Sequence, residues 1–257
     1  MIARADTRLA SELVPSPNFG PRRAGLRPTI LLLHYTGMPT CAGAIDWLTR
    51  AESQVSCHYA IDGEGRITQM VAEEMRAWHA GDSAWAGETD INSASIGIEV
   101  HNPGHDFSYP DFPEPQLGAV EALCKDIVAR HGIAPERVLA HSDVAPHRKQ
   151  DPGEKFPWAR LAAAGIGHWV APAPVVAAEP GMGVGVAGPL VADVQKLFAS
   201  YGYGVEATGV IDSRTEQVAA AFQRHFRQAR VDGRIDQSTI TTLQRLLAAL
   251  PGASQIA

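Results

Sequence analysis

Three side chains that lie far apart in this sequence could together bind one metal ion: His34, His141 and Asp151. Each histidine follows directly after a short apolar run that reads as a buried strand, so both could emerge at one edge of a sheet. Neutral imidazoles and a carboxylate suit zinc, and three protein ligands leave a fourth position open for water. An open zinc site favours hydrolysis. For either histidine taken alone, a hydrogen-bonded structural role is the better interpretation.

Two charged side chains could complete a hydrolytic site. Glu99 lies in the apolar run 95–100, on the face opposite Ile96, Ile98 and Val100. Lys149 precedes the candidate aspartate by two residues, which in an extended segment places both side chains on one side. Amide hydrolysis needs a proton acceptor and a positive charge near the developing oxyanion. On pattern alone, Glu99 could instead be a solvated strand residue and Lys149 a surface lysine.

The elements that must position these residues alternate between strands and helices. Such alternation predicts an α/β domain with a mixed central β-sheet flanked by helices, over residues 28–170. Residues 1–27, which are polar and punctuated by proline and arginine, are expected to form an irregular lead-in. The expected strands cover 29–33, 55–61, 66–71, 95–100 and 138–140, with a hairpin turn at 62–65, and the expected helices cover 42–52 and 115–130.

A change in composition separates a second region. Residues 171–188 are rich in Ala, Pro, Gly and Val and are expected to form a linker. Residues 189–257 are expected to form a helical domain, with helices at 190–200, 215–226 and 239–250. The pattern G-x-I-D-x-x-T occurs there twice, at 209–215 and 233–239, and each aspartate, Asp212 and Asp236, is placed to cap the start of a helix.

Composition limits the class of protein. Of the 257 residues, 45% are hydrophobic and 19% are charged, which is typical of a globular protein. The net charge of −6 argues against nucleic-acid binding driven by bulk charge. Three widely spaced cysteines predict free thiols, and the first residues do not read as a leader, so we expect a cytoplasmic protein. A leader removed earlier would instead favour the periplasm or the outer membrane.

Five sequence blocks in one order resemble the type 2 N-acetylmuramoyl-L-alanine amidases. The segment 141–153 (HSDVAPHRKQDPG) resembles their signature H-x-D-[IV]-A-P-x-R-K-x-D-P-G. The upstream blocks are LHYT at 33–36, SCHY at 56–59, AWHAG at 77–81 and SIGIE at 95–99. The resemblance covers residues 28 to 169, and the AmpD/AmiD branch of the family is the most similar.

The C-terminal region resembles a three-helix peptidoglycan-binding domain. The likeness lies in Gln195, the segments 201–203 and 221–223, and the two repeated motifs. Ile235 stands where this domain often has an aromatic residue. Glycan binding and a purely structural or dimerising role therefore both stay open.

The resemblance implies a zinc enzyme that hydrolyses the amide between N-acetylmuramic acid, or its 1,6-anhydro form, and L-alanine of the stem peptide, in cell-wall recycling or turnover. The expected partners are therefore peptidoglycan fragments. It assigns zinc to His34, His141 and Asp151, proton transfer to Glu99, stabilisation of the oxyanion to Lys149, and substrate contacts to Trp78 and His79. Tyr35, next to a candidate ligand, could either contact the substrate or merely pack. The alternative is a non-catalytic peptidoglycan recognition protein. Residues able to bind zinc fill all three ligand positions here, which favours catalysis.

Overall fold

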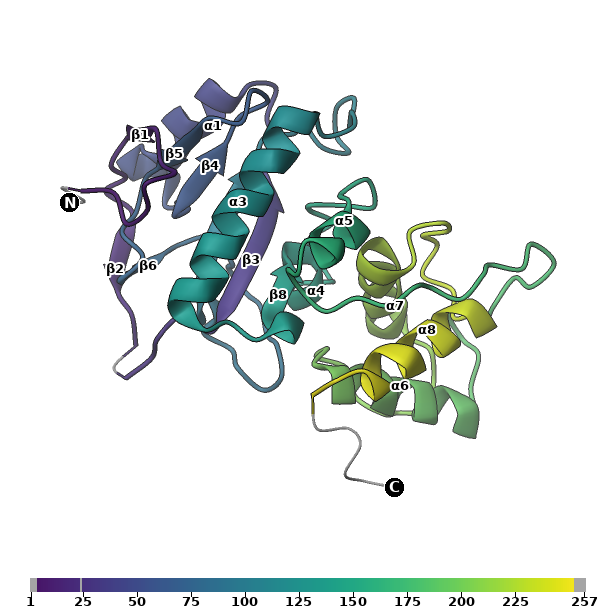
Figure 1. The fold of residues 1–257 in the computed structure, drawn as a ribbon. Coiled ribbons are helices and arrows are strands. Elements are labelled where there is room, and N and C mark those ends of the chain that lie inside the picture. The colour runs from purple at the N-terminus through teal and green to yellow at the C-terminus, as the bar shows by residue number, and fades with distance from the viewer. Residues whose placement is uncertain (1–3, 24, 252–257) are drawn as a thin grey trace.

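A computed structural model describes residues 4–23 and 25–251. These residues form a sheet domain that is followed by three C-terminal helices (Figure 1). The strands are β1 (Glu12–Leu13), β2 (Phe19–Pro21), β3 (Ile30–Tyr35), β4 (Tyr59–Ile61), β5 (Ile67–Gln69), β6 (Met75–Ala77), β7 (Ser95–Val100) and β8 (Val138–Ala140). The α-helices are α1 (Cys41–Leu48), α2 (Ile91–Ala94), α3 (Glu114–His131), α4 (His141–Val144), α5 (Trp158–Ala163), α6 (Pro189–Tyr201), α7 (Ser213–Phe226) and α8 (Gln237–Ala248), and 3-10 turns span Ala51–Ser53 and Pro135–Arg137.

The main sheet is mixed and has six strands in the order β1-β5-β4-β7-β3-β8. Strands β4, β7, β3 and β8 run parallel to one another, and β5 runs antiparallel to β4. The expected mixed α/β fold is therefore confirmed. The hairpin, the strand at 95–100 and the three C-terminal helices also lie where the sequence patterns predict them, to within a few residues at their ends.

The two faces of the sheet are covered by different parts of the chain. Leu31 and Leu33 of β3 pack in one apolar cluster with residues of α3, which lies across that face (Figure 1). Ile30 and Leu32 point to the opposite face and share a cluster with residues of α6, α7 and α8. Because side chains alternate along a strand, His34 lies on this second face, the side of the C-terminal region.

The lead-in at residues 1–27, expected to be irregular, contains two short strands among the residues that the structure describes. β1 pairs in parallel with β5, and β2 pairs antiparallel with β6 in a separate two-stranded sheet. Asn18 anchors the segment, because its side-chain amide donates to the carbonyls of Arg50 and Val55 at 2.7 and 2.8 Å. Strands of two or three residues are too short to show hydrophobic alternation, so long-range pairing gives this segment its order.

The repeated motifs of the C-terminal region begin two helices, as predicted. Asp212 accepts a hydrogen bond from the Thr215 amide at 2.8 Å at the start of α7, and Asp236 accepts one from the Thr239 amide at 2.7 Å at the start of α8. The segment between α5 and α6 forms no helix or strand longer than an isolated bridge. The domain boundaries read from the sequence stay a prediction.

Within the described residues, no helix is both long enough and apolar enough to cross a membrane.

Candidate active site

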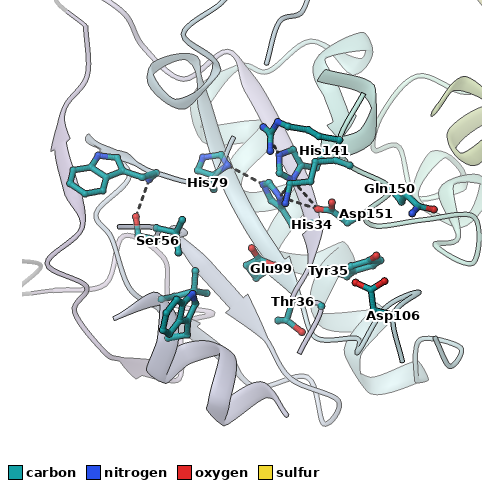
Figure 2. A pocket seen from close by; sticks show the side chains of 17 residues that line it. His34, Tyr35, Thr36, Ser56, His79, Glu99, Asp106, His141, Gln150 and Asp151 are labelled. Atoms are coloured by element: carbon teal, nitrogen blue, oxygen red, sulfur yellow. Dashed lines mark hydrogen bonds and ion pairs between the residues drawn. The ribbon is translucent and has the colours of Figure 1, made fainter. Parts of the chain in front are cut away.

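The carboxyl ends of three parallel strands bring the candidate catalytic residues together (Figure 2). His34 of β3 is the register partner of Glu99 in β7, so the two side chains stand next to each other on one face of the sheet. Leu33 lies opposite Ala140 of β8, so His141, the first residue of α4, follows at the level of His34 in β3. Strand register, rather than proximity in sequence, therefore forms the site.

Three possible ligand atoms converge at this edge. The Nδ1 atoms of His34 and His141 lie 2.9 Å apart, and Asp151 Oδ2 lies 3.0 Å from His141 Nδ1 and 3.2 Å from His34 Nδ1. A backbone hydrogen bond of 3.0 Å from the Ser142 amide to the Asp151 carbonyl holds the aspartate beside α4. All three side chains are buried, with exposures of 1%, 3% and 5%.

The size of this triangle fits a zinc ion. Zinc bonds of about 2.0–2.1 Å in a tetrahedron separate neighbouring ligand atoms by about 3.3 Å. The three separations here, 2.9, 3.0 and 3.2 Å, are close to that value. Two imidazole nitrogens and one carboxylate oxygen form a donor set that zinc prefers, and one position stays open for water or substrate.

A backbone carbonyl fixes which nitrogen of His141 is free. His141 Nε2 lies 3.2 Å from the carbonyl oxygen of Ala80, and a carbonyl oxygen can only accept a hydrogen bond. Nε2 therefore carries the hydrogen. The lone pair of Nδ1 then points toward Asp151, the orientation that a metal ligand needs.

A chain of hydrogen bonds determines which nitrogen of His34 carries the hydrogen. Ser95 Oγ donates to the Ile91 carbonyl at 2.6 Å, so it accepts from His79 Nε2, 3.3 Å away. His79 Nδ1 then accepts from His34 Nε2 at 3.0 Å (Figure 2), which leaves the lone pair on His34 Nδ1. Burial, reinforced by the nearby His141, lowers the pKa of His34 to about 4, so the ring is neutral at pH 7.

Cys57 also lies close to His34 and His79, and the three could form a second ligand cluster. Burial raises the pKa of the Cys57 thiol well above its ordinary value. A metal binds the thiolate, which this environment disfavours. The triangle formed with His141 and Asp151 is therefore the better metal site.

Glu99 has an oxygen that nothing else in the described structure uses. Its Oε2 is buried and has no hydrogen-bond partner among the described residues. Burial, reinforced by the negative charge of Asp151, raises the pKa of Glu99 well above its ordinary value, and the positive charge of Lys149 opposes this rise. A carboxylate with a raised pKa and a free oxygen can accept a proton near neutral pH.

A cleft of about 410 Å³ surrounds these residues. All eight residues singled out from the sequence line it: His34, Tyr35, Trp78, His79, Glu99, His141, Lys149 and Asp151. Tyr35 lies toward the rim, where its hydroxyl is 3.0 Å from His105 Nδ1. Burial raises the pKa of Tyr35 to about 12, so its hydroxyl keeps the proton at neutral pH.

Trp47 and Arg148 are among the cleft residues that sequence reasoning did not single out. Trp47 is 44% exposed and lies on the outer side of α1, whose Ala44 and Leu48 are buried. A tryptophan on the polar side of a predicted helix is a signal that could have identified it. Arg148 donates hydrogen bonds to the carbonyls of Ala80 and Asp82. It lies within the family signature, but pattern alone did not distinguish it from a surface arginine.

Comparisons with known proteins match two regions of the chain to known families. The profile of the N-acetylmuramoyl-L-alanine amidase family matches residues 24–154, and that of a peptidoglycan binding domain matches residues 187–250. The N-acetylmuramoyl-L-alanine amidase AmiD of Escherichia coli is 38% identical over 237 residues, 86% of this chain and 83% of AmiD. The 1,6-anhydro-N-acetylmuramyl-L-alanine amidase AmpD of the same species is 34% identical over 165 residues, 58% of this chain and 88% of AmpD.

Solved structures extend the similarity to three dimensions. The complex of E. coli AmiD with the substrate anhydro-N-acetylmuramic acid-L-Ala-D-γ-Glu-L-Lys has a TM-score of 0.74 at 36% identity, and covers 88% of this chain and 91% of that one. AmpDh3 from Pseudomonas aeruginosa in complex with anhydromuramic pentapeptide has a TM-score of 0.72 at 33% identity, with 88% and 93% covered. Both similarities extend over the sheet domain and much of the C-terminal region.

Proposed function

Because this chain belongs to the N-acetylmuramoyl-L-alanine amidase family, we propose that His34, His141 and Asp151 hold one zinc ion in its active site. The enzyme hydrolyses the amide between the muramic acid and L-alanine of a peptidoglycan stem peptide. The observation that carries the zinc assignment is the triangle of buried ligand atoms, 2.9–3.2 Å on each side, with both Nδ1 lone pairs directed into it.

The substrate that we propose is a 1,6-anhydro-muropeptide. Two solved relatives are described with anhydromuramyl peptides bound, and AmpD carries the anhydro sugar in its name. Trp47 and Trp78 line the cleft, and their flat apolar rings suit the faces of a sugar. Tyr35 and the ring of His79 line it as well, as candidate contacts for the substrate.

Each residue of the site then has a chemical role. When bound, zinc supplies a water of lowered pKa and polarises the carbonyl of the amide. Glu99 takes the proton from the attacking water through its free carboxylate oxygen and later gives a proton to the leaving amine. Lys149, which also lines the cleft, places a positive charge where the carbonyl oxygen becomes negative.

The cytoplasm stays our proposed location. All three cysteines lie in the described part of the chain as free thiols, and two of them, Cys57 and Cys124, are buried. Free thiols are typical of a reducing compartment. Cell fractionation, followed by detection of the enzyme with an antibody, tests this location against the periplasm and the outer membrane.

A zinc and cleavage experiment tests the proposed function. We expect the purified chain to bind one zinc ion and to release the free peptide from anhydro-N-acetylmuramyl tripeptide, as measured by elemental analysis and mass spectrometry. His34→Ala and Asp151→Ala should lose both properties. His147→Ala is the matched control, because His147 is an exposed histidine of the same signature segment and contacts Asp82 and Arg214 instead.

Zinc bound with normal stoichiometry by His34→Ala would contradict the ligand assignment. Zinc binding by the wild-type chain without cleavage of this substrate or of intact peptidoglycan would favour the non-catalytic alternative. Faster cleavage of intact peptidoglycan than of the soluble fragment would overturn the proposed substrate but not the zinc site.

A further inference from the structure

The C-terminal region contacts the short helix that carries His141 through one buried carboxylate. Asp143, the third residue of α4, is fully buried. Its Oδ1 accepts a hydrogen bond from the Tyr203 hydroxyl at 2.7 Å, and its Oδ2 accepts from His225 Nδ1 at 2.7 Å and from the Ala140 amide at 2.8 Å. Two of these three donors therefore come from the C-terminal region.

Both donors are held firmly by aromatic packing. The His225 ring stacks on Trp158 and on Phe226, each at 3.7 Å between ring centroids. Tyr203 packs edge-on against Trp85 at 4.9 Å. The backbone also approaches closely here, because a Cβ at Gly202 would come within 2.6 Å of the Trp85 ring. The donors therefore have little freedom to follow Asp143 if it moves.

Asp143 in turn determines where α4 begins. Its hydrogen bond to the Ala140 amide closes the turn between the end of β8 and His141, the first residue of α4. The next residue, Ser142, donates its amide to the Asp151 carbonyl at 3.0 Å. A displacement of α4 would therefore move His141, and Asp151 with it, relative to His34 of β3, whose Nδ1 lies 2.9 Å from His141 Nδ1.

We propose that Tyr203 and His225 are positioning residues of the metal site, acting through Asp143 on helix α4. The proposal rests on the zinc site described under the proposed function. A buried carboxylate that loses one of its donors must reorient or admit water, because an unpaired buried acceptor is costly. Partners behind a metal ligand commonly change metal affinity by about 10–100-fold when they are removed. Through these two residues the C-terminal region would thus help to position the metal site, whether or not it binds glycan.

The competing explanation is that these hydrogen bonds only hold the two regions together and do not affect the metal site. Tyr201 offers a matched control. Its hydroxyl also bonds across the interface, at 2.8 Å to His168 Nδ1, and it is nearly as buried as Tyr203, with 6% against 2% exposure. No hydrogen bond joins it to Asp143 in the described structure. Each Tyr→Phe change therefore removes one hydroxyl from the same interface, but only the Tyr203 hydroxyl is hydrogen-bonded to a residue of α4.

The experiment compares Tyr203→Phe with Tyr201→Phe in the full chain. Zinc dissociation constants come from competition with a chelator, and hydrogen exchange of the zinc-free chain reports the protection of residues 141–145. We expect Tyr203→Phe to weaken zinc binding about 10-fold, to lower kcat with KM unchanged and to reduce that protection. Tyr201→Phe should stay within about 2-fold of wild type in zinc affinity, although both variants lose some thermal stability.

His225 gives a second, independent pair of variants. His225→Gln can still donate to Asp143 through its amide, whereas His225→Leu cannot, so the glutamine should retain tighter zinc binding. Equal zinc affinities and equal protection of residues 141–145 in Tyr203→Phe and Tyr201→Phe would overturn the proposal. The contact would then only hold the two regions together. If the wild-type chain binds no zinc, the proposed function fails, and the exchange comparison still decides whether Tyr203 orders α4.

Discussion

Glu99 combines a raised pKa with a carboxylate oxygen that has no hydrogen-bond partner among the described residues, and it lies beside three candidate ligands that do not include it. Glu99→Gln keeps the shape of the side chain but removes its ability to take a proton. We expect kcat to fall about 10²- to 10⁴-fold, the usual contribution of a general base. The zinc content should stay at one ion per chain, measured by elemental analysis beside the kinetic assay.

Glu64→Gln is a suitable control for this variant. Glu64 is an exposed glutamate of the β4–β5 turn and pairs with Arg66, so its loss should change kcat by less than about 2-fold, since surface pairs contribute little. A Glu99→Gln enzyme with more than a tenth of the wild-type kcat would show that another group carries the proton.

At the residue level, the sequence predicted several residues of the cleft, although their spacing along the chain does not show that they meet. His34, Glu99 and His141 each follow from a strand pattern, because a residue at the end of a buried strand must emerge at the sheet edge. The pairing of β3 with both β7 and β8 is what brings them together, and no local pattern contains that information. Trp47 was missed because its position depends on where α1 rests beside the cleft.

The two helix caps of the repeated motif have the same sequence pattern but different surroundings. Asp212 caps α7 near the surface, where its side chain accepts from the amide and hydroxyl of Thr215. Asp236 caps α8 but is buried and also pairs with Arg227 and Arg230. We expect Asp212→Ala to lower the free energy of unfolding by about 1 kcal/mol. Asp236→Ala should cost about 3–5 kcal/mol, because it leaves a buried arginine without its partner.

Chemical denaturation of the two variants measures these free energies. Equal losses from Asp212→Ala and Asp236→Ala would mean that the cap alone matters and that the buried pair with Arg227 contributes nothing. Because both motifs lie in the same region and begin helices of similar length, each serves as the control for the other.

Helices and strands were predictable where hydrophobic periodicity extended over a full element. α3 and β7 match their expected ranges because each has a clear apolar face, and Gly132 ends α3 in the left-handed conformation that its position suggested. β1 and β2 were not predictable, because two or three residues carry no period and their partners lie some 55 residues further along the chain. Long-range pairing decides their structure.

The fold should lose stability in acid, and two buried groups that contribute to the loss are Glu73 and His58. Burial alone would raise the pKa of Glu73, but hydrogen bonds from Arg130, His131 and Tyr59 lower it to about 2. Burial lowers the pKa of His58 to about 3. A depressed carboxylate pKa contributes stability above about pH 4.5 that is lost as the pH falls toward 2, and a neutral buried histidine adds a loss that begins near pH 6.5. The free energy of unfolding should therefore fall continuously from about pH 6.5 to pH 2.

Glu73→Gln separates the two contributions. The variant should be less stable at pH 7, by an amount on the order of 3 kcal/mol, because the ionised carboxylate is what its partners stabilise. Its stability should then depend less on pH between about 4.5 and 2, while the loss that begins near pH 6.5 stays. Urea denaturation at a series of pH values measures both curves, and parallel curves below pH 4.5 would contradict the role of Glu73.

The sheet domain and the C-terminal helices share one apolar cluster, so we expect neither part to be fully stable without the other. Ile30, Leu32, Leu139 and Val144 of the sheet domain lie in the same cluster as residues of α6, α7 and α8. Burying one large apolar side chain contributes about 1.5–3 kcal/mol, so exposing four of them would cost on the order of 6–12 kcal/mol. That is comparable to the total stability of an ordinary domain, about 5–15 kcal/mol.

A chain that ends at residue 188 should therefore be unstable and should bind zinc poorly, even though it keeps every candidate ligand. Circular dichroism during heating, with dye binding to report exposed apolar surface, measures this. Adding residues 189–257 as a separate polypeptide should restore part of the melting temperature if the apolar face is the cause. A truncated chain with the melting temperature and zinc affinity of the full chain would mean that the shared cluster contributes little, and that the linker joins two independent domains as the composition of residues 171–188 suggested.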